Sequence, residues 1–379
     1  MSVLGRISVV IPTLDAVELI GDCLASVADQ GDIRIIVVDG GSTDGTLELL
    51  SMIPVKVMRG PGPGPAAARQ VGIRAARTPW VALIDADVVL PSGALEALFH
   101  EASERKLEGI NAMAEHVSSG GYWSDQLVRH HGRAPSRDWF GVSAALVRRS
   151  MLQEVPFDVR LASGEDIDLR LRLQRAGRAV GTSRAVTVRH RYARGWRVAV
   201  DQWTADGAGL GRLVRKDGLE GLRWAQLPVA AVAIGMVRSV SDGFLTLPYY
   251  VGHLIGNLVG LVVGLSDRRI PFGPRGQVAS VLAAAVIWGI GVMAVVVPIL
   301  AIRLGIAVAP RLAQTSLDSQ LLPAATAAFV VLVVFREIDR AGREARPSDA
   351  AIDRVLVVVG LIVGIGALLR LLAILEVLA

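Results

Sequence analysis

The sequence predicts an α/β domain with a mostly parallel sheet, followed by an all-α domain of apolar helices. Short, continuously apolar runs alternate with helical periodicities up to about residue 224, the pattern of a parallel sheet covered on both faces. Long Ala/Val/Leu/Gly runs follow, and the mean hydropathy of the chain is +0.48. We therefore predict two domains, 1–225 and 226–379.

The elements of the first domain follow from local periodicity. We predict strands at 7–12, 33–40, 55–60, 80–87 and 139–147. Helices are predicted at 17–28, 44–52 and 66–77, and a further one begins at Glu165. The first residues lack a basic stretch before an apolar core and a cleavage site, so we expect no cleavable signal and a cytosolic first domain.

Composition narrows the classes of partner. The net charge is +5 and the pI near 9.8, which suits a protein that lies against anionic membrane lipids. No helix-turn-helix, zinc-finger or RNA-binding signature accompanies the charge, so we expect no nucleic acid partner. A single cysteine, Cys23, excludes an internal disulfide and argues against a cysteine-rich metal site.

Acidic residues stand at the ends of three predicted strands. Asp15, Asp39 and the pair Asp85 and Asp87 lie at or just past the ends of these strands. In parallel sheets, ligands bind at the carboxyl ends of the strands. Two carboxylates spaced one residue apart can both reach one divalent ion, and hard oxygen ligands suit Mg²⁺ or Mn²⁺. The alternative for the "DAD" pair is an exposed acidic turn.

The stretch "VDGGSTDGT" (38–46) follows its strand without a gap. Gly40 and Gly41 permit a tight turn, and Ser42 or Asp44 can cap the next helix. Asp39 can accept hydrogen bonds from a nucleobase or a ribose, or it can belong to a capped strand–helix turn only. No Gly-Lys-Ser/Thr follows, so the stretch is not a P-loop.

Five stretches, in order and with matching spacing, resemble the family 2 glycosyltransferases of GT-A fold over about residues 5–200. They are "VVIPTLD" (9–15), "VVDGGSTDGT" (37–46), "GPAAARQVGIRAA" (64–76), "VALIDAD" (81–87) and "GEDIDLRLRLQRAG" (164–177). The resemblance implies a nucleotide-sugar donor, UDP- or GDP-linked, and a metal-dependent transferase. Asp15, Gly40 and Gln70 depart from residues common in the family, which leaves the sugar and the nucleotide open.

The resemblance also assigns roles to residues. It implies nucleotide contacts from Pro12, Thr13, Asp15, Asp39, Ser42, Arg69, Asp85 and Ala86. It implies metal contacts from Asp85 and Asp87, with His190 as a third ligand. It makes Asp166 the catalytic base, with Glu165 beside it. The alternative for Glu165 and Asp166 is a pair of helix-capping acids, which the helix dipole favours.

Basic residues suggest where an acceptor binds. The stretch "RAVTVRHRYARGWR" (184–197) is rich in arginine, and Arg191 and Arg194 are candidates for binding a diphosphate or a lipid phosphate. A solvated basic face is the alternative. Arg148 and Arg149 match a place where the family often has a basic residue near the acceptor.

The second domain has four to five segments of the length and composition of membrane helices, at 226–265, 278–302, 319–337 and 355–375. Segment 226–265 is predicted as a hairpin, because that keeps the arginine-rich loops 266–277 and 336–354 on the cytosolic side. Glycines spaced by four, Gly256/Gly260/Gly264 and Gly360/Gly364, favour close helix packing and allow a homo-oligomer.

Together these features predict an integral membrane enzyme with a cytosolic catalytic domain. It would transfer a sugar from a nucleotide donor to a lipid acceptor, polyprenyl phosphate first. One alternative is a transferase that elongates a lipid-linked oligosaccharide or a glycolipid. The other, from a different class, is a catalytically silent membrane scaffold that binds nucleotide sugars; intact Asp85, Asp87 and Asp166 argue against it.

Overall fold

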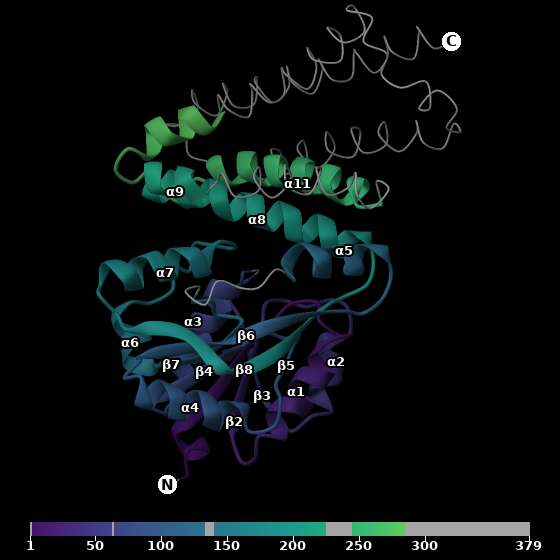
Figure 1. The fold of residues 1–379 in the computed structure, drawn as a ribbon, viewed down its shortest axis with the longest axis vertical. Coiled ribbons are helices and arrows are strands. Elements are labelled where there is room, and N and C mark those ends of the chain that lie inside the picture. The colour runs from purple at the N-terminus through teal and green to yellow at the C-terminus, as the bar shows by residue number, and fades with distance from the viewer. Residues whose placement is uncertain (1, 63, 133–139, 225–244, 285–379) are drawn as a thin grey trace, which may run out of the picture. The chain divides into compact units, whose positions relative to one another are not determined.

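The computed structural model describes residues 2–62, 64–132, 140–224 and 245–284 of the chain (Figure 1). It divides into two compact units, Met1–Gln202 and Trp203–Ala379. This division lies inside a long helix, α8, and the predicted domain boundary at residue 225 stays a prediction.

Unit 1 holds all the strands that the structure describes. They are β1 (Ile7–Thr13), β2 (Arg34–Asp39), β3 (Lys56–Arg59), β4 (Trp80–Ile84), β5 (Val88–Val89), β6 (Gly109–Ser118), β7 (Ala144–Arg148) and β8 (Val180–Tyr192). Its helices are the short 3₁₀ turn η1 (Leu4–Arg6), α1 (Ile20–Ala28), α2 (Thr46–Ser51), α3 (Pro65–Ala75), α4 (Ala94–Glu104), α5 (Tyr122–His131), α6 (Arg149–Glu154) and α7 (Glu165–Arg175). Helix α8 (Trp196–Asp217) runs from unit 1 into unit 2, which continues with α9 (Leu219–Trp224) and α11 (Leu247–Leu265).

The strands form one mixed sheet in the order β3-β2-β1-β4-β7-β6-β8-β5. The pairs β3–β2, β2–β1, β1–β4 and β6–β8 are parallel. The pairs β4–β7, β7–β6 and β8–β5 are antiparallel. The predicted α/β class is confirmed, and its parallel part is the half that contains the acidic strand ends. Strand β7 runs antiparallel to both of its neighbours, β4 and β6.

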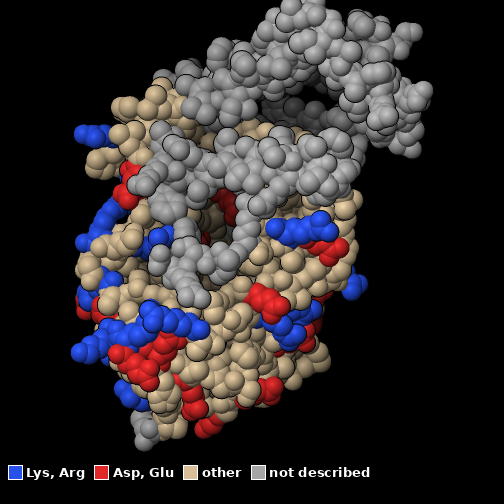
Figure 2. All heavy atoms as spheres, in the orientation of Figure 1, with Lys and Arg blue, Asp and Glu red and all other residues tan. Residues whose placement is uncertain are grey.

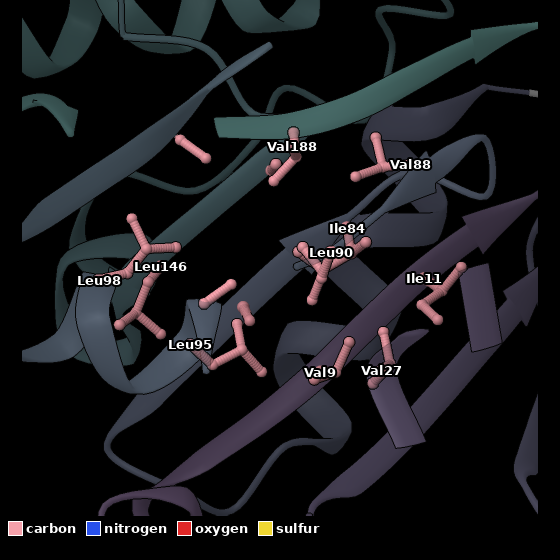
Figure 3. Packing of buried hydrophobic residues seen from close by; sticks show 14 of the residues in the cluster. Val9, Ile11, Val27, Ile84, Val88, Leu90, Leu95, Leu98, Leu146 and Val188 are labelled. Carbon is pink, nitrogen blue, oxygen red and sulfur yellow. The ribbon is translucent and has the colours of Figure 1, made fainter. Parts of the chain in front are cut away.

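Helices cover both faces of the sheet, and alternate residues of β1 enter two different cores. Val9 and Ile11 belong to one core cluster, which also includes Val27 of α1 and Leu98 of α4 (Figure 3). Val10 lies in the other core, which also holds residues of α3, α6 and α7. Figure 2 shows basic and acidic side chains intermingled on the visible face of this unit.

Helix α3 lies unusually close to β1. A Cβ built at Gly72 would fall 2.2 Å from a methyl carbon of Val10, so this position of the helix accepts only glycine without a shift. Pro65 stands in the first turn of α3, where its missing N–H costs no intrahelical bond. The close approach sets the depth at which the buried side chains of α3, Arg69 among them, reach the sheet.

Unit 2 is described for α8, α9 and α11 and up to residue 284. Among the described residues, one helix segment, Pro248–Leu265, is long and apolar enough to cross a bilayer, and 50% of it is buried inside the structure. The predicted segments 319–337 and 355–375 lie outside the described residues, as do residues 225–244 and most of 278–302. The all-α membrane domain therefore stays a prediction.

Glycines of α11 contact α8 of the same chain. A Cβ at Gly260 would lie 2.2 Å from the carbonyl oxygen of Thr204, and one at Gly264 would lie 2.1 Å from that of Ala208. The small residues predicted to favour helix packing thus let two backbones approach within the chain. An oligomer through this glycine face would have to displace α8.

Candidate functional site

The carboxyl ends of the three parallel strands β1, β2 and β4 meet at one edge of the sheet. Thr13 at the end of β1 pairs with Asp39 at the end of β2, and β4 lies on the other side of β1. A cavity of about 370 Å³ opens there. Of the predicted site residues, it is lined by Pro12, Thr13, Asp15, Arg69, Asp85, Ala86, Asp87 and Glu165. Four separate stretches of sequence therefore converge on one hollow.

The rim of this cavity is built by two loops that hold each other. The backbone of Asp15 has φ 48°, and its N–H donates to Ser42 Oγ at 2.9 Å. Thr43 N–H donates to Asp15 Oδ1 at 2.7 Å. Aspartate tolerates the left-handed region better than most residues, and these bonds fix it there. Asp15 thus holds the two loops together at the opening of the cavity.

Asp39 and Ser42 lie behind the rim and do not line the cavity. Asp39 is 2% exposed, and its carboxylate accepts the Gly41 N–H at 2.8 Å and the Ser42 hydroxyl at 2.5 Å. These bonds close the turn after β2, where Gly41 has φ 104°. The structure gives Asp39 the role of a turn residue, and the nucleotide contact implied by the resemblance stays a prediction.

Arg69 of α3 joins two acidic motifs in the wall of the cavity. Its side chain is 3% exposed, and its two terminal nitrogens donate to Asp85 Oδ1 and to Glu165 Oε1, each at 2.6 Å. The guanidinium also lies 5.9 Å from the ring centroid of Phe157. A buried cation of this kind is stable only with its partners in place. Arg69 therefore fixes both carboxylates, and both of its terminal nitrogens are occupied.

The ionisable groups of this cluster shift one another's pKa values. Burial raises the pKa of Glu165 to about 7, although Arg69 opposes the shift, and the nearby Asp166 adds to it. The pKa of Asp85 is raised as well, by burial first, against the effect of Arg69 and with that of Asp87. For Arg69, burial acts to lower the pKa, but Asp85 and Glu165 raise it overall. The arginine is charged, and burial favours the protonated form of both carboxyl groups.

The "DAD" turn follows the end of β4 directly. Strand β4 ends at Ile84. The Asp85 N–H donates to the Ser143 carbonyl at 2.8 Å, and the Val88 N–H donates to the Asp85 carbonyl at 3.0 Å, which closes a turn. Asp87 then faces β8, where its Oδ2 lies 3.0 Å from His190 Nε2. Burial acts to lower the pKa of His190, but Asp87 raises it to about 9, so the two form an ion pair.

The turn has an unfilled acceptor. Asp87 Oδ1 is buried and has no hydrogen-bond partner among the described residues. Within the described ranges no group of three or more His, Cys, Asp or Glu side chains is arranged to hold a metal ion. Asp85 and His190 already have partners. The donor set thus fits a hard divalent ion bound chiefly through Asp87, with water and phosphate oxygens completing its shell.

The predicted base lies next to the cavity wall. Helix α7 begins after Gly164, whose φ is 74°, and Glu165 and Asp166 occupy its first turn as predicted. Glu165 is buried and turned toward Arg69, whereas Asp166 is half-buried and is not among the lining residues. The catalytic role of Asp166 stays a prediction.

The predicted basic residues do not gather at one place. Arg191 forms an ion pair with Asp22, and Arg194 Nε donates to the Ser119 carbonyl at 2.5 Å. Arg148 pairs in register with Trp80, the first residue of β4. Arg148 and Arg149 therefore lie at the edge of the sheet opposite to the cavity.

Sequence reasoning missed a group of stacked rings beside Asp87. His116 of β6 pairs in register with His190 of β8, and their ring centroids are 5.4 Å apart. Tyr192 hydroxyl lies 3.2 Å from His116 Nδ1, and the His131 ring stacks on Tyr192 at 5.6 Å. The two-residue spacing of His190 and Tyr192 in a strand places both on one face, which was the available signal.

Comparison with known proteins gives the family of this domain. Residues 8–155 match the model of the family described as glycosyl transferase family 2. A poly(ribitol-phosphate) beta-glucosyltransferase of Bacillus spizizenii is 32% identical over 127 residues, which are 28% of this chain and 20% of that protein. A pre-mycofactocin glycosyltransferase of Mycobacterium tuberculosis is 32% identical over 166 residues, 38% of this chain and 34% of that protein.

The chain thus spans less than half the length of these curated relatives. Among solved structures, Staphylococcus aureus TarS 1–349 in complex with UDP-GlcNAc gives a TM-score of 0.42 at 17% identity, over 69% of this chain and 83% of that one. A mannosyltransferase of Pyrobaculum calidifontis in complex with GDP-Man and Mn²⁺ gives 0.47 at 18% identity, over 67% and 87%. The match of residues 8–155 identifies this part of the chain as a glycosyltransferase family 2 domain.

Proposed function

We propose that the chain is a membrane-bound, metal-dependent glycosyltransferase that moves a sugar from a nucleotide-sugar donor to a lipid acceptor, polyprenyl phosphate. One observation carries the proposal: Arg69, Asp85, Asp87 and Glu165, from three separate motifs, line one cavity at the carboxyl ends of parallel strands. Such an edge is where ligands bind in α/β sheets.

The donor's diphosphate would lie against the "DAD" turn. Asp85 and Asp87 would hold Mg²⁺ or Mn²⁺, Asp87 through an Oδ1 atom that has no hydrogen-bond partner in the described part of the chain. When bound, the ion would neutralise the negative charge of the departing diphosphate. Arg69 keeps Asp85 in place through a 2.6 Å bond, so the turn is preorganised before the donor arrives.

The acceptor side of the reaction would be served by the first turn of α7. Asp166, half-buried beside the cavity wall, would take a proton from the acceptor oxygen or orient an acceptor that is already anionic. Glu165 would act through Arg69, to which it is bonded at 2.6 Å, and would thereby tie the position of α7 to that of the "DAD" turn.

The proposal of a lipid acceptor is based on the sequence after residue 225. That region is rich in apolar segments, and Pro248–Leu265 is long and apolar enough to cross a bilayer. An enzyme anchored in this way would meet a lipid-linked acceptor at the membrane surface, with residues 1–225 on the cytosolic side where nucleotide sugars occur. The two curated relatives act, by their names, on different acceptors, so they support sugar transfer in general.

The test uses the purified full chain with a panel of UDP- and GDP-linked sugars, Mg²⁺ or Mn²⁺, and polyprenyl phosphate. We expect transfer from one donor to the lipid. Asp166→Asn keeps the shape of the side chain but cannot accept a proton, so turnover should fall by about two to four orders of magnitude with donor affinity retained.

Donor binding without transfer or donor hydrolysis across the whole panel would favour the silent scaffold. Transfer to a lipid-linked sugar but not to polyprenyl phosphate would favour the elongating enzyme. Turnover of Asp166→Asn within a few-fold of wild type would mean that Asp166 is a helix-capping residue and not the catalytic base.

A further inference from the structure

A second hollow lies at the edge of the unit 1 sheet opposite to the donor cavity. It is a groove of about 700 Å³ lined by Arg34, Ile36, Lys56, Arg74, Ala75, Ala76, Arg77 and Arg149. Arg34 and Lys56 are the first residues of β2 and β3, two neighbouring parallel strands. The starts of parallel strands lie at the edge away from their carboxyl ends, so this groove is separate from the cavity described above.

The groove gathers positive charge from four elements. Arg34 comes from β2, Lys56 from β3, Arg74 and Arg77 from the end of α3 and the residues after it, and Arg149 from the start of α6. Among the described residues, the lining includes five cations and no carboxylate. Five is also the net charge of the whole chain. Like charges around one hollow repel one another, and a bound anion relieves that repulsion.

The cations have no internal counter-charge. In the part of the chain that the structure describes, none of the five forms an ion pair, whereas Arg69, Arg105, Arg172 and Arg178 all do. Arg149 is half-buried and held in place: its Nε donates to the Ile73 carbonyl at 3.2 Å and its N–H to the Pro79 carbonyl at 2.9 Å. The wall also includes fully buried Ile36 and Ala76, which give the groove a rigid apolar floor.

The lining chemistry selects a class of ligand. We propose that this groove is a second binding site, for a compact phosphate-bearing anion with two or more negative charges. Arginine forks bind phosphate oxygens through paired hydrogen bonds, and four of the five cations are arginines. The described lining residues include no aromatic side chain on which a base can stack, which disfavours single-stranded nucleic acid.

The phosphate can belong to a soluble molecule or to the headgroup of an anionic lipid, and the experiment separates these sources. The purified full chain in neutral detergent is titrated calorimetrically with inorganic pyrophosphate and, separately, with dioctanoyl phosphatidic acid. EDTA is present throughout, so that metal-dependent binding at the "DAD" turn does not contribute. The groove variant is Arg74→Gln/Arg77→Gln, since both side chains are exposed and neither forms an ion pair among the described residues.

The matched control is Lys106→Gln/Arg129→Gln, which removes the same two charges from exposed positions outside both hollows. We expect the wild type and the control to bind one of the two probes alike, and the groove variant to bind it at least about tenfold more weakly. A second groove variant, Arg34→Gln/Lys56→Gln, should show the same loss from the other side of the groove.

Tighter binding of pyrophosphate assigns the site to a soluble ligand, and tighter binding of phosphatidic acid assigns it to a lipid headgroup. The proposal is overturned if the wild type binds neither probe. It is equally overturned if the groove variants, folded as judged by an unchanged melting temperature, bind as tightly as the control. Neither result depends on whether the enzyme transfers a sugar.

Discussion

At the scale of single residues, the candidate site depends on Arg69, which bonds carboxylates from motifs 16 and 96 residues away along the chain. The sequence offers only an arginine inside an Ala-rich helix. Its two partners become visible only once α3 and α7 are placed against the same sheet. A residue of this kind couples the two halves of the site, because neither carboxylate can move without losing a charged bond.

Replacing Arg69 tests this coupling. Arg69→Met leaves the buried Glu165 and the partly buried Asp85 without their cation, and breaking a buried pair costs about 3–5 kcal/mol. We expect a clear drop in the melting temperature of the full chain and loss of donor binding. Arg69→Lys keeps one charge but lacks the fork, so it should fold and bind the donor weakly.

The control for this pair is Arg74→Met on the same helix, at an exposed position, which should change stability by no more than about 0.5 kcal/mol. If Arg69→Met melts with the control and still binds the donor, the bridging role is wrong.

Glu165 gives the site a dependence on pH. Burial raises its pKa from the usual 4.5 to about 7, against the effect of Arg69. Between these values the folded protein binds more protons at this residue than the unfolded chain does. The contribution of Glu165 to stability is therefore fully present below about pH 4.5 and is lost as the pH rises toward 7.

Melting temperatures of wild type and Glu165→Gln across this pH window measure the effect, since other titrating groups contribute alike to both proteins. The wild-type value should fall relative to that of the variant as the pH rises. Two parallel profiles would mean that the pKa of Glu165 is not raised in the folded state.

At the scale of elements, sequence reasoning succeeded where periodicity is local. The strands β1, β2, β3 and β4 and the helices α1, α2, α3 and α7 lie within a few residues of their predicted positions. The long strands β6 and β8 were missed. Charged and half-exposed residues interrupt their apolar pattern, so neither reads as a continuous run. Their pairing matters, because it brings His190 to Asp87.

The reversal of the sheet at β7 was equally out of reach. Apolar runs divided by helices predict parallel pairing, but strand direction depends on how the connection before the strand runs. That connection includes residues 133–139, outside the described ranges. The consequence for the site was direct: Arg148 and Arg149, expected near the acceptor, lie at the other edge of the sheet.

The close packing of α11 on α8 can be tested by its effect on the stability of the chain. The helices touch through backbone atoms, and Arg212 and Asp267 form a buried ion pair at 2.7 Å near the end of α11. Gly260→Leu would push a side chain into the Thr204 carbonyl, and overpacking of this kind costs about 1–3 kcal/mol. We expect a lower melting temperature for the detergent-solubilised full chain.

Val251→Leu enlarges a side chain on the same helix at a position that is 39% exposed, and it should melt like wild type. Equal melting temperatures for the two variants would show that α8 and α11 are not packed through their glycines.

At the scale of the whole molecule, the functions proposed for the two parts of the chain are supported in different ways. For residues 8–155, motifs, geometry and family match agree on a glycosyltransferase family 2 domain. The later part is predicted from hydropathy, and a single candidate span lies within the described residues. The class of chemistry was implied by the resemblance of five short motifs to the family 2 glycosyltransferases, since such motifs are local signals. The acceptor depends on contacts that no short motif encodes.

Asp87 is proposed to bind a metal ion against the diphosphate of a nucleotide sugar. Its buried Oδ1 has no hydrogen-bond partner among the described residues, which is the expected state of a ligand atom without its ion. The direct measurement is calorimetry of the full chain with UDP- and GDP-linked sugars, with Mn²⁺ and with EDTA. Asp87→Ala is compared with Asp32→Ala, an exposed acid in the turn before β2.

Wild type and Asp32→Ala should bind one donor with Mn²⁺ and lose most of that affinity in EDTA. Asp87→Ala, still folded, should bind weakly in both conditions. If all three proteins bind the donor equally well with Mn²⁺ and with EDTA, the metal site at Asp87 does not exist.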